Sequence, residues 1–364
     1  MKFIVLIIPL VFFTKVCVIA QRVLVTNDTT IQVTLDSTGY SEIQPQDISE
    51  EAGLFIYSKD GREAVRIYGS FRMLTVWDNK KNFHPYDLTQ PTIPTEQDDY
   101  RYPNSIWTAK MSRLGIDALI GSHKLSDVLI RMEFDWKGDN EKFRIRHAFL
   151  RTKNWLFGKS WSSFNNVAYL VQAIDGRFAV GAIGTRPIQV RYYNQLKNWK
   201  YQVSLEYSVP KVIQPNNIST EGAFLWPNLA TNISYEKDFF NFMVAGVIRS
   251  NRVQYTNNGN GSENHLAYGG TLAARLNINS NNRLKSSAGG GVGIGGLLGD
   301  FAFVPIDLAY NSNTQEFENV NVFTGYIGFE HDWSDQFTSS LGYGVTTTEE
   351  KHFSIMNFIS MAAK

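Results

Sequence analysis

The residues whose type and spacing could do chemistry are arginines that alternate with large apolar residues. Arg144 and Arg146 flank Ile145, and Arg191 follows Val190. The planar guanidinium group keeps its charge and matches the geometry of carboxylates and related anions. Because successive side chains of a β-strand point to opposite faces, such a strand presents guanidinium groups on one face and apolar groups on the other. The chemistry on offer is the binding of anions along one face of a sheet.

Nine arginines fall on the polar side of segments that alternate in this way. In a soluble sheet that side is solvated, whereas in a membrane barrel it faces a wet lumen and the apolar side faces lipid. These arginines could contact a solute, or they could pair across the wall with Asp117, Glu133, Asp135 and Glu206, and both remain open. The nine are Arg66, Arg72, Arg113, Arg131, Arg144, Arg146, Arg191, Arg249 and Arg275.

Long period-two segments are the elements that must position these arginines. The clearest is Val128–Lys137, and similar alternation recurs from Ala64 to Val345. The segments are about ten residues long, as a tilted membrane strand requires, whereas ordinary strands have about five or six residues. Aromatic residues at their ends fit the aromatic belts of a membrane barrel, although aromatics also simply favour strands. The ends in question carry Trp77, Trp136, Tyr207, Tyr235 and Trp333.

The connections between these segments alternate in length, as they do in outer-membrane barrels. Residues 137–142, 194–199 and 332–337 read as short turns. Longer polar connections are predicted at residues 79–105, 165–185, 210–226 and 251–265. Within Gly158–Gly184 we expect a loop that folds inward as a constriction. Its basic residues, with the start of the following strand, are Lys159, Arg177 and Arg186. The glycine-rich stretch Ala288–Gly299 predicts either a kinked strand or a second inward loop.

The N-terminal segment predicts export. A basic start, an apolar run and small residues before Gln21 are typical of a secretory signal peptide over residues 1–20. Residues 21–60 then form a periplasmic or luminal segment, and residues 61–364 form the barrel. Cys17 is the only cysteine, so the mature chain has no disulfide or thiolate chemistry. We expect Sec-dependent export to the bacterial outer membrane.

Composition excludes several other classes of protein. A net charge of +1 gives no general basic surface for nucleic acid. High aromatic content with slightly polar mean hydropathy fits a membrane barrel, but it also fits a large soluble β-sandwich. The six histidines are scattered, and neither a HExxH nor a GxSxG motif is present. We therefore expect no enzyme activity, no metal and no cofactor.

The order of three short motifs resembles DcaP-like outer-membrane porins. They are Arg146-His147-Ala148-Phe149, then GKSWSSF from Gly158, then Arg186, Gln189 and Arg191. Lys159 stands where this family usually has glutamine, and Phe149 where it has tyrosine. The region from Gly53 resembles Bacteroidetes-type members. The resemblance runs to the C-terminus and implies an all-β transmembrane antiparallel barrel of about 16 strands, a homotrimer in outer-membrane lipid and lipopolysaccharide, and uptake of small anions such as dicarboxylates.

Two features of the sequence do not fit this pattern smoothly. The chain ends at Ser360-Met361-Ala362-Ala363-Lys364 rather than at an aromatic residue, and only about a dozen strands can be counted. A C-terminal truncation is the hypothesis that accounts for both.

His147 lies between Ile145 and Phe149, at a position that strand alternation assigns to the lipid-facing side. This predicts that His147 lies in the trimer interface. A β-bulge that shifts the parity is the alternative.

The sequence therefore predicts a porin-like barrel that lets small anionic solutes diffuse through an arginine-lined lumen. The alternative is a surface β-protein without transport, such as an adhesin or a glycan binder that uses its long aromatic loops.

Overall fold

The computed structural model describes ten stretches of the chain. These are residues 53–57, 63–78, 104–120, 128–138, 142–171, 180–214, 219–256, 261–301, 306–334 and 337–348. The predicted signal peptide, most of the 21–60 segment, Arg177 and the last residues of the chain lie outside them. The sheet begins before the predicted boundary at residue 61, because a strand already covers Leu54–Tyr57.

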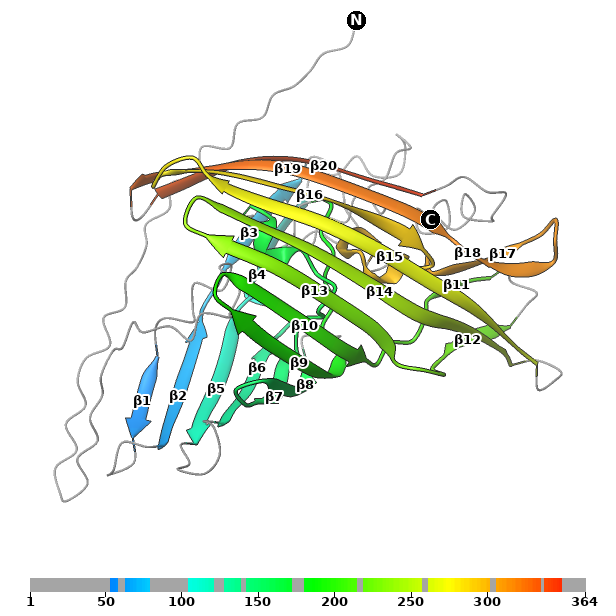
Figure 1. Ribbon diagram of the computed structural model, residues 1–364, viewed down its shortest axis with the longest axis horizontal. Coiled ribbons are helices and arrows are strands. Elements are labelled where there is room, and N and C mark those ends of the chain that lie inside the picture. The colour runs from blue at the N-terminus through cyan, green and yellow to red at the C-terminus, as the bar shows by residue number, and fades with distance from the viewer. Residues whose placement is uncertain are drawn as a thin grey trace, which may run out of the picture.

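One curved antiparallel sheet dominates the structure (Figure 1). Among the described residues it has 15 strands, and consecutive members of its main path are hydrogen-bonded neighbours. The path runs through β1 (Leu54–Tyr57), β2 (Glu63–Ser70), β5 (Arg113–Ile120), β6 (Val128–Asp135), β7 (Arg144–Arg151), β8 (Trp155–Lys159), β9 (Ile188–Leu196), β10 (Trp199–Glu206), β13 (Asn228–Lys237), β14 (Phe240–Tyr255), β15 (Ser262–Asn277), β16 (Asn282–Val292), β19 (Asn321–Ser334) and β20 (Phe337–Thr348). The remaining strand, β12 (Thr220–Ala223), pairs with β14.

The connections confirm part of the predicted alternation. Residues 197–198 join β9 to β10, and residues 136–143 join β6 to β7, so both are short. The predicted loop at 251–265 is wrong, because β14 and β15 continue into it as a hairpin with Gln254 opposite Ser262. Two small sheets lie beside the main one. One is the β3 (Leu74–Asp78) and β4 (Asn104–Thr108) hairpin, and the other joins β11 (Val212–Ile213), β17 (Leu308–Asn311) and β18 (Glu316–Asn319).

The strands carry apolar side chains on the outer face and polar side chains on the inner face. On β10, Val203 and Leu205 are 45% and 50% exposed, whereas Ser204 and Glu206 are buried. On β6, Met132 is exposed while its neighbour Arg131 is buried. This is the reverse of a soluble sheet, and it suits a wall with lipid outside and water inside. The antiparallel ladders pair the backbone groups that lipid could not satisfy.

A β-bulge interrupts this alternation in β7. Glu133 of β6 pairs with His147, but the next residue, Phe134, pairs with Ile145. Arg146 is therefore the extra residue, and the side chains of Arg146 and His147 are both buried on the inner side. Beyond the bulge the alternation of inward and outward side chains is shifted by one residue, and Phe149 accordingly lines an inner cavity.

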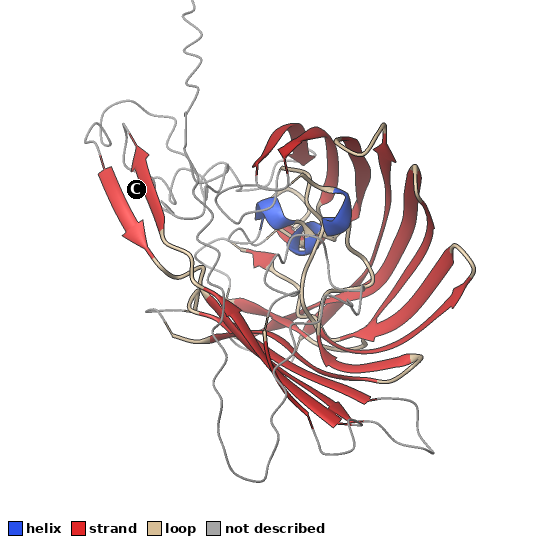
Figure 2. Ribbon diagram, turned by 90° about the vertical axis from the view of Figure 1, so that its left-hand side faces the viewer, coloured by secondary structure: helices blue, strands red, loops and turns tan. Residues whose placement is uncertain are grey.

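Two segments fold into the concave side of the sheet (Figure 2). The first is formed by residues 160–171 and 180–187, and it contains the 3-10 helix η4 (Val167–Tyr169). The second follows β16 and contains η5 (Gly295–Leu297) and η6 (Gly299–Phe301). They meet at a bridge between Ile183 and Leu298, both almost completely buried. The glycine-rich stretch is thus both a strand end and an inward loop. A Cβ at Gly289 would lie only 2.9 Å from Ile183, so the missing side chain makes room for the first loop.

No helix among the described residues is long and apolar enough to cross a membrane.

Candidate functional site

A network of ion pairs covers the inner face of β2, β5, β6 and β7. Asp117 lies between two arginines of neighbouring strands. Arg131 binds it with two contacts of 2.8 Å, from Nε to Oδ1 and from Nη2 to Oδ2. Arg66 donates to the same carboxylate from its Nε at 3.1 Å. The alternative expected from the sequence, pairing across the wall, is therefore present at Asp117.

The second part of the network gathers around Glu133 and Asp135. Arg146 reaches both carboxylates, with Nε 2.5 Å from Glu133 and Nη1 3.3 Å from Asp135. Arg144 also binds Asp135, although its side chain is 44% exposed. The hydroxyl of Tyr68 donates to Glu133 at 3.2 Å. Arg144 and Arg146 both point inward, so that two arginines share these acids.

Positive charge exceeds negative charge on this part of the wall. The same four strands also place Arg113 and Arg151 on the inner face. Six arginines there face three carboxylates, so the pairing leaves a net excess of three positive charges. The six are Arg66, Arg113, Arg131, Arg144, Arg146 and Arg151. Arg72 lies just after β2, where its backbone N–H donates to Ser112 at 3.0 Å.

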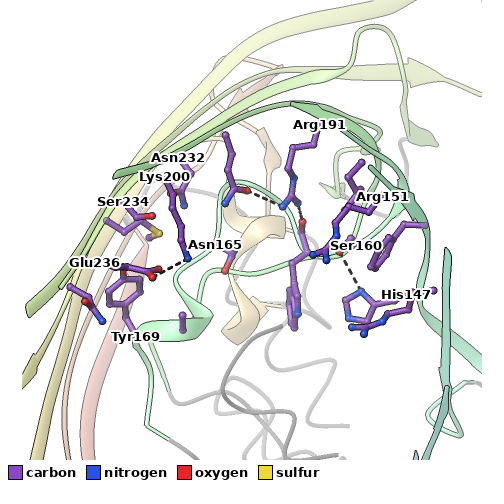
Figure 3. A pocket seen from close by; sticks show the side chains of 18 of the residues that line it. His147, Arg151, Ser160, Asn165, Tyr169, Arg191, Lys200, Asn232, Ser234 and Glu236 are labelled. Atoms are coloured by element: carbon purple, nitrogen blue, oxygen red, sulfur yellow. Dashed lines mark hydrogen bonds and ion pairs between the residues drawn. The ribbon is translucent and has the colours of Figure 1, made fainter. Parts of the chain in front are cut away.

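A cavity of about 270 Å³ lies between this wall and the strands β9 to β15 (Figure 3). We call it the lower cavity. Five cationic side chains and one carboxylate line it. They are Arg131, Arg151, Arg191, Lys200, Arg275 and the acid Glu236. The wall around them is polar, with Gln202, Asn232, Ser234 and Asn241, and it has one aromatic hydroxyl, that of Tyr169.

The cations of the lower cavity are held to different degrees. Arg191 is fixed by Gln189 at 3.0 Å, by Gln202 at 2.9 Å and by the carbonyl of Trp161. Lys200 pairs with Glu236 at 2.9 Å. The Nε of Arg275 is buried and has no hydrogen-bond partner. The lower cavity therefore offers guanidinium donors to a ligand that can only accept hydrogen bonds.

His147 belongs to the inner side, so its predicted place in a trimer interface is wrong. Its Nδ1 lies 3.4 Å from the Oγ of Ser160, and its ring contacts that of Trp161 at a centroid distance of 6.3 Å. All three residues line the lower cavity. The bulge at Arg146 is the physical reason, because it shifts the alternation by one residue immediately before His147.

Hydrogen bonds to the wall hold the described part of the first inward segment, residues 160–171 and 180–187, inside the sheet. Glu206 of β10 accepts from the Ser162 hydroxyl at 2.7 Å and from the Ser163 backbone N–H at 2.8 Å. Glu206 therefore binds serines of the loop rather than an arginine, contrary to one sequence prediction. On the opposite wall, Lys285 donates to the carbonyl of Leu170 at 3.0 Å. We call this segment the inward loop.

The predicted basic residues of the inward loop lie where it leaves and rejoins the wall. Lys159, at the end of β8, donates to the carbonyl of Arg186 at 2.8 Å. The guanidinium of Arg186 lies 3.6 Å from the ring centre of Trp161, and its Nε has no hydrogen-bond partner. Burial, and after it the like charge of Arg146, lowers the pKa of Arg186. Arg177 lies outside the described residues.

The structure brings together only some of the nine arginines predicted from sequence. Arg131, Arg191 and Arg275 line the lower cavity, while Arg249 lies elsewhere and pairs with Asp307 at 3.1 Å. Sequence analysis missed Arg151, Lys200 and Glu236. Lys200 could have been found, because it shares a face of the strand with the polar residues Gln202 and Glu206. Arg151 was missed because the bulge in β7 moves it from the predicted lipid-facing side to the inner side.

A long antiparallel sheet with an apolar outside, a charged inside and an inward loop defines an outer-membrane porin fold. Within that class the family is clear. The chain belongs to the DcaP outer membrane protein family, whose model matches residues 56–358.

Solved structures agree on the fold. The outer membrane channel DcaP of Acinetobacter baumannii is similar, with 20% identity, a TM-score of 0.66, and coverage of 83% of this chain and 84% of that one. An anion-selective porin from Comamonas acidovorans is similar at 10% identity and a TM-score of 0.53, with 79% of this chain and 80% of that one covered. A search of curated proteins found no match.

Proposed function

We propose that this outer-membrane porin lets small anionic solutes, dicarboxylates among them, diffuse passively through its arginine-lined lumen. The observation that carries the proposal is the lower cavity, with five cations and one carboxylate. Carboxylates are natural partners for guanidinium groups because both are planar and form paired hydrogen bonds. Several weak sites in series favour permeation over tight retention. The dicarboxylate preference rests on the family resemblance.

Further parts of the proposal rest on different support. A homotrimer is what the family resemblance implies, now without His147 as a contact. Sec-dependent export is supported by the sequence pattern of residues 1–20. We also propose transport without catalysis. Ser160 and His147 form a serine–histidine contact, but among the described residues no carboxylate is hydrogen-bonded to His147 to complete a triad.

A planar bilayer experiment on the purified full-length protein tests the proposal. We expect stepwise conductance and a reversal potential of the sign given by anion preference under a KCl gradient. Absence of steps would favour the alternative of a surface protein without transport. Steps with cation preference would leave the porin intact but contradict the role given to the arginines.

A further inference from the structure

A second cavity, of about 230 Å³, lies beside residues 185–187, where the inward loop rejoins the wall. We call it the upper cavity. It is displaced along the same strands as the lower cavity, because β10 contributes Lys200 to the lower cavity and Glu206 to the upper one. Lys200 is one residue from the short turn at 197–198, so the upper cavity lies toward the end of the sheet with the longer connections. Its lining includes Arg186, Lys211, Arg249, Glu206, Asp307 and Ser208.

Two arginines of the upper cavity keep an unused donor. Arg249 is 2% exposed and donates to Asp307 at 3.1 Å and to Ser208 at 3.3 Å, but its buried Nε has no partner. The buried Nε of Arg186 has none either. Buried donors of this kind are normally satisfied, so each unpaired one needs an explanation.

The two carboxylates of the upper cavity are already engaged by other groups. Asp307 accepts the backbone N–H of Gly296 at 2.7 Å and that of Lys211 at 2.8 Å, in addition to Arg249. Glu206 accepts its hydrogen bonds from serines. Three cations and two carboxylates therefore leave one net positive charge, together with donors that the protein itself does not satisfy.

We propose that the upper cavity binds one phosphate-type oxyanion between Arg186 and Arg249. An oxyanion has only acceptor atoms, so it suits a cavity lined by these two guanidinium groups, whose Nε atoms have no hydrogen-bond partner within the protein. Arg249 is on the inner face, beside the exposed outer residue Ile248, so the ligand is a dissolved anion from the lumen and not a lipid headgroup. The volume is sufficient for one such ion and some water.

The upper cavity is also a second position along the lumen at which an anion can bind, and this part rests on the proposed function. Arg186 lines the upper cavity while it stacks on Trp161, which lines the lower one. The stack is therefore the contact between the two cavities. An anion that moves from the upper to the lower cavity therefore passes Arg186, which is one of its two arginine partners in the upper cavity.

Calorimetric titration of the purified full-length protein in detergent with inorganic phosphate tests the site. A charge-neutral pair of changes, Arg249→Gln with Asp307→Asn, removes the central guanidinium without altering net charge. Arg186→Gln is the second variant, in case the first does not fold. The matched control is Arg252→Gln on the same strand, because Arg252 binds Ser262 at 3.0 Å and lines neither cavity.

We expect about a tenfold loss of affinity, or more, for one phosphate in both test variants, since hydrogen bonds to charged groups have about this effect. The control should bind as the wild type does. Unchanged titrations in both test variants would overturn the site. The reversal potential separates the two proposals. Anion preference with unchanged titrations rejects only the upper site, whereas a phosphate loss in a channel without anion preference supports the site and rejects the proposed function.

Discussion

The hydrogen bonds of Glu206 make a sharp prediction about the inward loop. This carboxylate accepts from Ser162 at 2.7 Å, from the Ser163 backbone at 2.8 Å and from Ser204 at 2.6 Å. The first two bonds join the loop to β10. Glu206→Gln keeps the shape of the side chain, removes its charge, and turns one acceptor oxygen into an NH₂ group.

The magnitude follows from these contacts. A hydrogen bond to a charged group contributes about 1.5–3 kcal/mol, and a neutral one about 1 kcal/mol. Weakening both loop contacts therefore costs roughly 2 kcal/mol, which multiplies the undocked fraction of the loop by about thirty. Because the loop occupies the concave side of the sheet, undocking should change the current through a single channel.

Single-channel recording in planar bilayers measures this change. We expect frequent transitions between conductance levels in Glu206→Gln. The control is Glu236→Gln, which also removes one inner carboxylate but breaks only the pair with Lys200, in which Glu236 is 46% exposed. An equal frequency of these transitions in the two variants would refute the idea that Glu206 holds the inward loop against β10.

Two further predictions concern stability, measured as the urea midpoint of unfolding in detergent. Arg131→Ala leaves Asp117 buried with one fewer partner, so it should lower the free energy of unfolding by about 3–5 kcal/mol. Arg144→Ala removes a side chain that is 44% exposed, so it should lower this free energy by about 1 kcal/mol or less. Equal losses in the two variants would contradict the distinction between buried and exposed pairs. Gly158 has φ +124° and a backbone oxygen 2.3 Å from an added Cβ, so Gly158→Ala should lower the midpoint, while Gly246→Ala, with its nearest atom at 3.5 Å, should not.

Period-two alternation predicted the wall correctly where strands are regular. On β10 the buried Ser204 and Glu206 and the exposed Val203 and Leu205 follow it. It failed on β7, because one extra residue at Arg146 shifts every later side chain to the opposite face. Nothing local in the sequence marks that bulge. It is stabilised by contacts of Arg146 with acids of the neighbouring strand, which become visible only once the strands are paired.

The candidate site could be predicted only in part for a related reason. Alternation placed Arg131 and Arg275 on the inner face, but they are 144 positions apart, and only the order of the sheet brings them to one cavity. The inward loop was predicted from a long polar connection that carries basic residues, and not from periodicity. Its docking on Glu206 was missed, because serines of a distant loop compete with arginines for the same carboxylate.

The most direct test of the central claim is the reversal potential of Arg275→Gln beside that of the wild type. Removing one charge about 6 Å from a permeating anion changes its energy by about 0.7 kcal/mol in a watery lumen, or roughly threefold in occupancy. We expect the wild type to prefer chloride over potassium, and Arg275→Gln to lower this preference by about that factor. A wild type that prefers potassium, or a variant with unchanged preference, would contradict it.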